Sequence, residues 1–165
     1  MTALSNGGLS GQSGVMVAGP DLNMWSTDST ATTPGIAQVG TGVCDHSLAE
    51  CNLKGLDAPN IVLVGASLQG DNLLGAQLGN ARLIGARMHG DNLNGAQLQH
   101  AFLNGADLER ANLRGADLSG ADLSRADLTG ANLHGATLHG VTWSDTICPD
   151  GSNSDTDGGT CANNH

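Results

Sequence analysis

The chain has 165 residues, of which 25 are glycine and 2% are aromatic, and its 16 acidic and 6 basic side chains give a formal net charge of −10. This charge argues against binding to nucleic acid or to anionic membrane surfaces, because both require clustered lysine and arginine. No apolar run approaches the roughly 20 residues that a membrane-spanning helix needs, and the length favours one domain with one modest core.

Residues 1–45 form a segment rich in glycine, serine and threonine, in which no sequence period is visible. Such a composition predicts a flexible tail, with an ordered cap or an assembly arm as the alternative. The first ten residues lack the basic and apolar regions of a signal peptide. We therefore expect either a cytoplasmic protein or a mature form from which a signal peptide has been removed.

Residues 46–145 divide into twenty blocks of five residues without an insertion. The third residue of a block is leucine in seventeen of them, and the first is alanine and the fifth glycine in thirteen each. A helix would rotate successive leucines by about 140°, and a flat strand would point them to opposite faces. The pattern instead predicts a chain that turns a corner every five residues and keeps each leucine inside.

A longer period of twenty residues is superimposed on these blocks. Residues 70–78 and 90–98 agree at eight of nine positions. If four blocks close one turn, residues twenty apart stack on adjacent turns at about 4.8 Å. Gln77 and Gln97 recur at this spacing. A longer series predicts a ladder of stacked amides along the tube, and it consists of Asn52, Asn72, Asn92, Asn112 and Asn132.

The A(D/N)LxG blocks of residues 46–145 resemble the pentapeptide repeat family. The resemblance implies an all-β fold, a right-handed quadrilateral β-helix of about five coils. In that fold the central leucine and the small residue two before it point inward, and the other three residues face solvent. Trp143 then takes the last inward position, and one inner column contains Leu73, Leu93, Leu113 and Leu133.

Asp71 and Asp91 stand at first positions, where most blocks have alanine. We expect two inward carboxyl groups on adjacent coils, and the pKa of at least one should be raised because both cannot ionise freely in a low dielectric. Three alternatives are open. The carboxyl groups accept hydrogen bonds from backbone N–H groups at the corner, a local slip of register turns them outward, or they form a cation site.

Other groups with catalytic chemistry are not brought together by the pattern. Acidic side chains occupy the exposed second position of several blocks, namely Asp107, Asp117, Asp122 and Asp127. Histidines are scattered over different faces, at His89, His134 and His139, whereas metal sites need convergent ligands. Because the uninterrupted blocks also offer no pocket-forming insertion, we expect neither enzyme activity nor a cofactor.

Outward positions on one face carry apolar side chains, and Leu74 lies on the neighbouring face. A contiguous apolar patch usually marks a contact surface. The alternatives are cover by residues 1–42, an interface with a second copy or a protein partner, and scattered exposure. The apolar positions on the shared face are Val62, Val64, Ile84 and Phe102.

Residues 146–165 break the repeat, and Cys148 and Cys161 bracket a loop of small and acidic residues. A tryptophan followed by "CPDG" and a later cysteine resembles the tails of secreted members of the family. That resemblance implies a disulfide between these two cysteines, worth about 3 kcal/mol in the chain-entropy model. Cys44 and Cys51 form a second candidate pair. An even cysteine count without metal spacing favours an extracellular or cell-surface protein over a cytoplasmic one.

Residues 153–159 contain the N-x-D-x-D-G opening of a calcium loop, with Asn153, Asp155 and Asp157 as ligands. The twelfth position is Asn164 rather than the bidentate glutamate of an EF-hand. A solvated acidic turn is therefore the favoured interpretation, and Ca²⁺ binding is the alternative.

Taken together, these features predict a non-enzymatic structural or interaction module that associates with further copies of itself or with a protein partner. Open β-helix ends or the apolar face would carry this association into oligomers or fibres. The alternative is an acidic DNA mimic that inhibits a type II topoisomerase (gyrase), as some acidic members of the family do. Against it, five coils make a tube only about 25 Å long.

Overall fold

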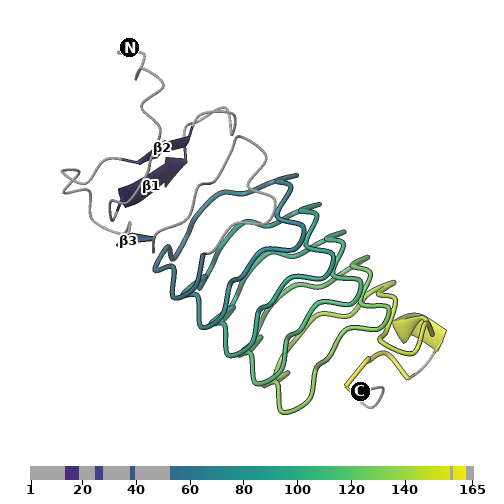
Figure 1. Cartoon of the computed structure of the whole chain (residues 1–165). Helices are drawn as coiled ribbons and strands as arrows, with labels where there is room; N and C mark the ends of the chain where they lie inside the picture. The colour runs from purple at the N-terminus through teal and green to yellow at the C-terminus, as the bar shows by residue number, and fades with distance from the viewer. Residues whose placement is uncertain (1–13, 19–24, 28–37, 40–52, 157, 163–165) are drawn as a thin grey trace.

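The computed structural model describes residues 14–18, 25–27, 38–39, 53–156 and 158–162. Three short strands, β1 (Gly14–Ala18), β2 (Trp25–Thr27) and β3 (Gln38–Val39), form an antiparallel sheet with β1 in the centre. One 3₁₀ turn, η1 (Ser154–Thr156), lies near the C-terminus. Between them the chain winds into a tube of stacked coils (Figure 1). The predictions for Cys44, Cys51, Asn52 and Asp157 lie outside the described residues.

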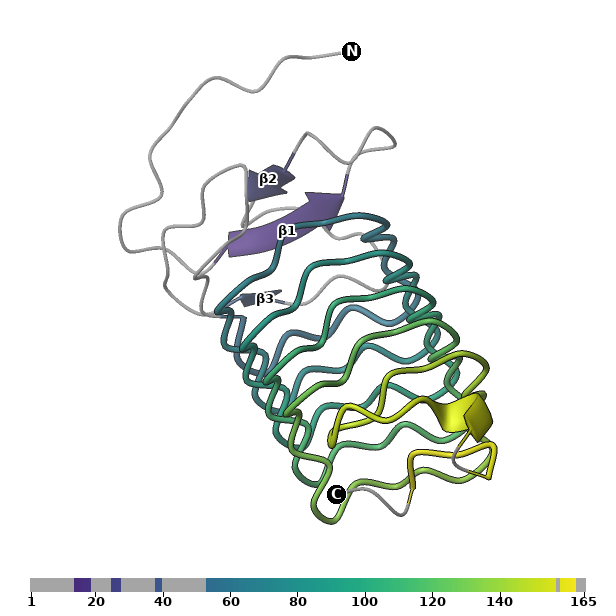
Figure 2. The ribbon, with the colours of Figure 1, turned by 90° about the vertical axis from the view of Figure 1, so that its right-hand side faces the viewer.

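The coils are joined by parallel β-bridges between residues that are twenty apart in the sequence. Such bridges begin with the pair Asp57 and Gln77. They recur at the second position of each successive block up to the pair Asp127 and Ile147. Around Asn92, for example, its N–H donates to the Asp71 carbonyl at 2.9 Å, and the N–H of Leu93 donates to the Asn112 carbonyl at 2.9 Å. One circuit of the tube therefore takes four blocks, and the coils stack along a common axis (Figure 2).

The interior of the tube is filled by the first and third residues of the blocks. The predicted inner column is buried, with Leu73, Leu93, Leu113 and Leu133 each at most 1% exposed. The alanines between the leucines are small enough to let neighbouring edges of the tube approach. Full burial of a leucine contributes about 1.5–3 kcal/mol, so the repeated leucines provide the main stabilisation of the fold.

Each corner is a β-turn from the third residue of one block to the first of the next. At one such corner the N–H of Ala96 donates to the Leu93 carbonyl at 3.0 Å, and Gly95 between them has a φ of 65°. A turn with a left-handed residue at its third position favours glycine there. This explains why glycine dominates the fifth position of the blocks. Where glycine is replaced, the left-handed conformation persists, as at Arg125 with a φ of 60°.

The four described asparagines of the predicted ladder, Asn72, Asn92, Asn112 and Asn132, stack in one column. The side chains of the first three are hydrogen-bonded along the tube. Nδ2 of Asn92 donates to Oδ1 of Asn72 at 3.3 Å, and Nδ2 of Asn112 donates to Oδ1 of Asn92 at 3.2 Å. Asn132 continues the column through its bridge to Asn112. The glutamine series behaves differently, because the longer side chain reaches back over its own corner. Nε2 of Gln77, for example, donates to the Gly75 carbonyl at 3.3 Å.

Candidate functional site

The apolar residues predicted on one face lie in two neighbouring columns of the tube wall. Val62 and Phe102 are 39% and 46% exposed, and Val64 and Ile84 beside them are half-buried. Leu74, on the adjoining face, is also half-buried. We call Val62, Val64, Ile84 and Phe102 the apolar patch.

Arg82 divides the apolar patch. It bridges to Val62 on one side and to Phe102 on the other, and it is exposed. Aromatic side chains and arginine, here Phe102 and Arg82, are enriched at protein interfaces. Ile147, which lies outside the repeat blocks and was not predicted as a surface apolar residue, is 37% exposed on a different face near the C-terminus. Ile147 is thus an isolated exposed apolar residue against which the patch can be compared.

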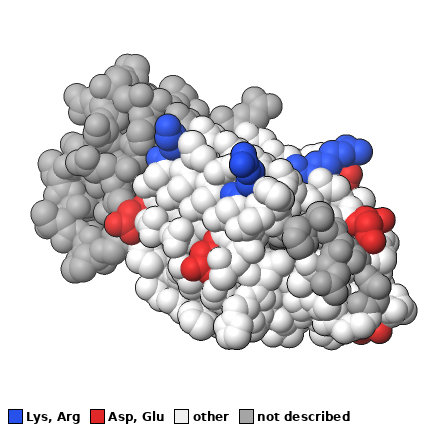
Figure 3. Space-filling view, turned by 90° about the horizontal axis from the view of Figure 1, so that it is seen from below, with Lys and Arg blue, Asp and Glu red and all other residues white. Residues whose placement is uncertain are grey.

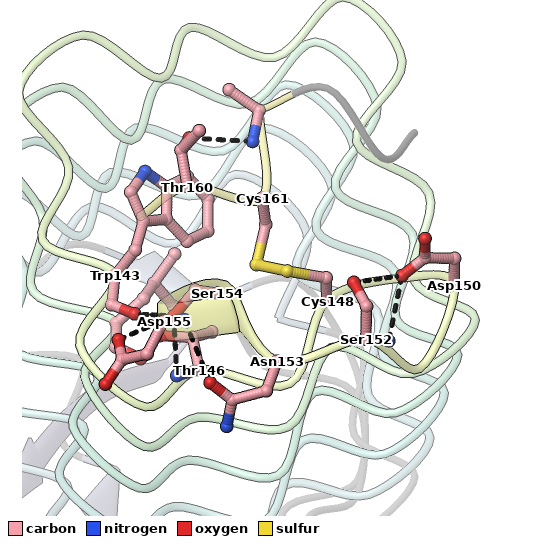
Figure 4. Close-up of a disulfide and its surroundings, with 12 residues drawn as sticks. Trp143, Thr146, Cys148, Asp150, Ser152, Asn153, Ser154, Asp155, Thr160 and Cys161 are labelled. Carbon is pink, nitrogen blue, oxygen red and sulfur yellow. Dashed lines mark hydrogen bonds between the residues drawn. A yellow bond between two sulfur atoms is a disulfide. The ribbon is translucent and has the colours of Figure 1, made fainter. Parts of the chain in front are cut away.

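The C-terminal end of the tube is covered by residues 146–156 and 158–162, which fold back on the last coil. Cys148 and Cys161 form a disulfide with a Cα–Cα distance of 5.2 Å, and both are buried (Figure 4). Trp143, in the last inward position, is 7% exposed and packs in the same core as the two cysteines. A large ring and a disulfide thus close the end of the hydrophobic interior.

Hydrogen bonds from this C-terminal cap satisfy backbone groups that would otherwise end the last coil without a partner. The N–H of Asp145 donates to Oδ1 of Asp155 at 2.9 Å, and the N–H of Cys148 donates to the Ser152 carbonyl at 2.8 Å. The Ser154 hydroxyl accepts from the N–H of Thr146 at 3.0 Å and donates to the Trp143 carbonyl. Open β-edges are templates for pairing, and the cap removes donors of this edge from such pairing.

The two described candidate ligands of the calcium loop, Asn153 and Asp155, belong to this cap. Oδ1 of Asn153 accepts a hydrogen bond from the N–H of Asp155 at 2.9 Å, and its Nδ2 donates to Oδ1 of Asp145 at 2.9 Å. Because Asp155 also accepts from the N–H of Asp145, both side chains have structural partners. Their arrangement is that of a hydrogen-bonded turn around η1.

Asp71 and Asp91 both point into the tube and are 1% and 0% exposed. Burial raises the pKa of Asp91 to about 8, although hydrogen bonds from the backbone N–H groups of Asp71 and Gly70 oppose the shift, and the neighbouring Asp71 carboxylate adds to it. The register slip that would turn the pair outward does not occur. Burial therefore favours the protonated form of the Asp91 carboxyl.

The acidic side chains predicted to be exposed at the second block position, Asp107, Asp117, Asp122 and Asp127, are instead half-buried, because they fold back onto their own corners and stabilise them. Oδ1 of Asp117 accepts hydrogen bonds from the hydroxyl and the N–H of Ser119, at 2.6 and 3.0 Å, and these bonds lower the pKa of Asp117. At Asp122, burial acts to raise the pKa, but the corresponding bonds from Ser124 outweigh it and the pKa is lowered. These carboxylates act as capping groups and are not arranged as acid–base pairs.

Charged side chains are sparse on the surface. On the face shown in Figure 3 the acidic and basic groups stand apart among uncharged residues. None of the helices that the structure describes has the length and apolarity to cross a lipid bilayer.

Solved structures of several repeat proteins are similar to this chain. Rfr23 from the cyanobacterium Cyanothece 51142 is 39% identical over 48% of this chain and 58% of Rfr23, with a TM-score of 0.28. The protein alr5209 from Nostoc Pcc 7120 is 38% identical over 46% of this chain and 68% of its own, with a TM-score of 0.30. QnrB1, a plasmid-mediated fluoroquinolone resistance protein, is 18% identical over 54% of this chain and 61% of QnrB1, with a TM-score of 0.29. The chain thus spans little more than half of Rfr23, and these scores carry no argument about function.

No curated protein sequence matches the chain. The repeat itself does match the profile of a protein family. The profile described as pentapeptide repeats matches in 8 copies, over residues 47–83, 62–90, 72–110, 92–130 and 106–145. These spans run from residue 47 to residue 145 and thus cover more than half of the chain. The inward leucines and left-handed fifth positions of the tube are what this repeat requires. The chain belongs to the pentapeptide repeat family.

Proposed function

We propose that this protein is a non-enzymatic interaction module, secreted or at the cell surface, that associates with a second copy of itself through the apolar patch. In this proposal residues 46–145 form five coils of a right-handed β-helix. The observation that carries it is the exposure of Val62 and Phe102, at 39% and 46%, with the half-buried Val64 and Ile84 beside them. Residues of this kind on a rigid surface are favourable to bury, at about 25 cal/mol per Å².

The C-terminal cap favours this face over the C-terminal end as the contact surface. Asp155 and Ser152 occupy donors of the last coil, and the buried disulfide covers the core behind them. A further chain that stacked on this end would have to displace these contacts. These contacts support association at the side wall that carries the apolar patch rather than at the C-terminal end.

A non-enzymatic role is supported by the use of the acidic side chains. Asp117 and Asp122 each accept hydrogen bonds from the residue two positions further on, and the pKa of each is lowered. A carboxylate held in this way by hydrogen bonds to its charged form is a poor proton acceptor at neutral pH. An extracellular location is supported by the Cys148–Cys161 disulfide, because structural disulfides persist in oxidising compartments.

The proposal is tested by the molar mass of the purified chain in solution, measured by light scattering coupled to gel filtration over a range of concentrations. We expect the wild type to form a concentration-dependent dimer and Phe102→Ser to shift it to a monomer. Ile147→Ser is the matched control, because Ile147 has a similar exposure on another face. A wild type that is monomeric throughout, or an equal loss of dimer in both variants, contradicts association through the patch.

The net charge of −10 favours a second candidate function, inhibition of a type II topoisomerase by an acidic surface that mimics DNA. In the column that carries Asp107 and Asp127, Arg87 lies next to Asp107 and Ile147 lies next to Asp127, so the acidic groups form no long row there. This arrangement makes DNA mimicry the weaker candidate. Loss of gyrase supercoiling activity on addition of the purified protein, at equal concentrations of enzyme and inhibitor, would favour it over the interaction module.

A further inference from the structure

Three side chains with metal-binding chemistry meet on one outer face of the tube. His89 projects from one coil, and Asp107 and Glu109 project from the next. One potential ligand atom from each of the three lies within 4.8 Å of the others. Nδ1 of His89 lies 3.6 Å from a carboxylate oxygen of Glu109. The residues come together because 89 and 109 are one circuit apart.

The backbone holds this cluster in place. On either side of His89, the N–H of Met88 donates to the Asp107 carbonyl at 2.7 Å, and the N–H of Gly90 donates to the Glu109 carbonyl at 2.9 Å. Oδ1 of Asp107 accepts from the N–H of Glu109 at 3.1 Å, which fixes the orientation of that carboxylate. The three Cα positions are therefore set by the fold, and only side-chain rotations remain to be adjusted when an ion binds.

The local charges suit a divalent cation. A neutral imidazole and two carboxylates carry a charge of −2, and all three side chains are half-buried. Two basic groups lie close by. Arg110 is 3.5 Å from Glu109 but its side chain is 72% exposed, and exposed Arg87 bridges to Asp107. A surface ion pair contributes about 0–1 kcal/mol, so the arginine side chain can turn into solvent when Glu109 binds an ion.

We propose that His89, Asp107 and Glu109 form an open binding site for one divalent ion of borderline hardness, of which Zn²⁺ is the type. Imidazole nitrogen and carboxylate oxygen bind Zn²⁺ at about 2.0–2.2 Å. The ligand atoms then need to contract to roughly 3.4 Å from one another, the spacing in a tetrahedral site with such bonds. Water completes the coordination. The site requires imidazole, which distinguishes it from a hard-cation site made of oxygen ligands alone.

The site does not depend on the proposed association, because it lies on the face next to the apolar patch and shares no residue with the patch. It is tested by calorimetric titration of ZnCl₂ into the full oxidised chain in a buffer that does not bind metals. We expect His89→Ala to abolish one binding event per chain that the wild type shows. Asp107→Asn and Glu109→Gln should each weaken this event at least tenfold. His134→Ala is the matched control, because His134 occupies the same block position on another face and is exposed.

A second readout separates the metal site from a simple ion pair between protonated His89 and Glu109. Addition of Zn²⁺ should shift the imidazole ¹⁵N resonances of His89 and leave those of His134 unchanged. Equal Zn²⁺ binding by the wild type and His89→Ala, or unmoved His89 resonances at saturation, would overturn the proposal. So would Mg²⁺ binding as tight as that of Zn²⁺, because an acidic surface would then be sufficient. Equal melting temperatures of the variants without metal confirm that folding is unaffected.

Discussion

The backbone N–H of Asp71 donates a hydrogen bond to Oδ1 of Asp91 at 3.0 Å, across two adjacent coils in the interior of the tube. This contact explains how an acidic residue replaces the usual alanine without breaking the repeat, since one carboxyl oxygen shares a backbone N–H that still donates to the Leu68 carbonyl at 3.0 Å within its own corner. The other oxygen of Asp91 has no hydrogen-bond partner among the described residues. A buried carboxyl group in this position is more stable when protonated.

This protonation predicts a stability that falls as the pH rises. Burial raises the folded-state pKa of Asp91 from 3.8 to about 8, so the folded chain binds a proton that the unfolded chain releases. The contribution is complete below the unfolded pKa and decreases through the window between the two values. Its slope is at most about 1.4 kcal/mol per pH unit for one group. Urea denaturation at pH 5 to 8 measures this slope.

Asp91→Asn should flatten the pH dependence between pH 5 and 8, because the amide does not titrate. All other titratable groups are the same in both proteins, so the difference between the two slopes isolates Asp91. Equal slopes would contradict burial of a protonated carboxyl group.

Replacement of both Asp71 and Asp91 by alanine should leave the free energy of unfolding unchanged or raise it. Alanine occupies the first position in thirteen blocks and fills the space without a buried polar group. Thermal unfolding at pH 8, where the acidic pair is least favourable, gives the most sensitive comparison. A large fall in melting temperature would show that the pair contributes to the stability of the fold.

The left-handed corners predict opposite effects of two matched substitutions. Arg125 has a φ of 60° and Gly95 a φ of 65°. A left-handed conformation costs a residue with a side chain about 1–2 kcal/mol, partly offset by the greater unfolded-state entropy of glycine. Arg125→Gly should therefore stabilise the tube by up to about 1 kcal/mol. Gly95→Ala should destabilise it by a similar amount, although a Cβ there would meet nothing within 4 Å. Chemical denaturation of both variants tests the sign.

The asparagine column predicts a graded loss of stability. Asn92 bonds to both Asn72 and Asn112 along the tube, and it also accepts from the N–H of Asn94 at 3.3 Å. Asn92→Ala should lower the free energy of unfolding by about 1–3 kcal/mol, since each bond contributes about 1 kcal/mol. Asn132→Ala is the control. In the part of the chain that the structure describes, the side chain of Asn132 makes one hydrogen bond, which its Oδ1 accepts from the N–H of His134 rather than from a neighbouring asparagine. Equal losses would show that the ladder bonds add nothing.

The C-terminal cap predicts a local effect of disulfide loss. The double variant Cys148→Ser and Cys161→Ser should release the cap, because the loop loses about 3 kcal/mol of chain-entropy stabilisation. Hydrogen exchange should then accelerate at the amides of Asp145 and Cys148, whose acceptors lie in the cap. The amide of Leu98, which donates to the Asp117 carbonyl within the tube, should keep its protection. Uniform acceleration would indicate that the disulfide stabilises the whole fold.

The sequence alone was sufficient for the architecture. Leucine at the third position of a block encodes an inward side chain, and glycine at the fifth position encodes a left-handed corner. Both signals lie within five residues, so the information is local. The period of twenty added which residues stack, and Asn72, Asn92 and Asn112 lie in one column as predicted. The family resemblance is confirmed by the matched repeats.

Only the tertiary structure decided how side chains use these positions. Gln77 has the spacing of a ladder residue, but its side chain donates a hydrogen bond to the Gly75 carbonyl. The rotamer depends on the length of the side chain and on the contacts that the neighbouring coil offers. The convergence of His89 with Glu109 needed the same register that predicted the asparagine column, but it also depended on which way two long side chains turn. The cap, where Ser154 bonds to both Trp143 and Thr146, has no repeat to define its path. Its conformation is set by the unpaired end of the last coil, which exists only once the tube has formed.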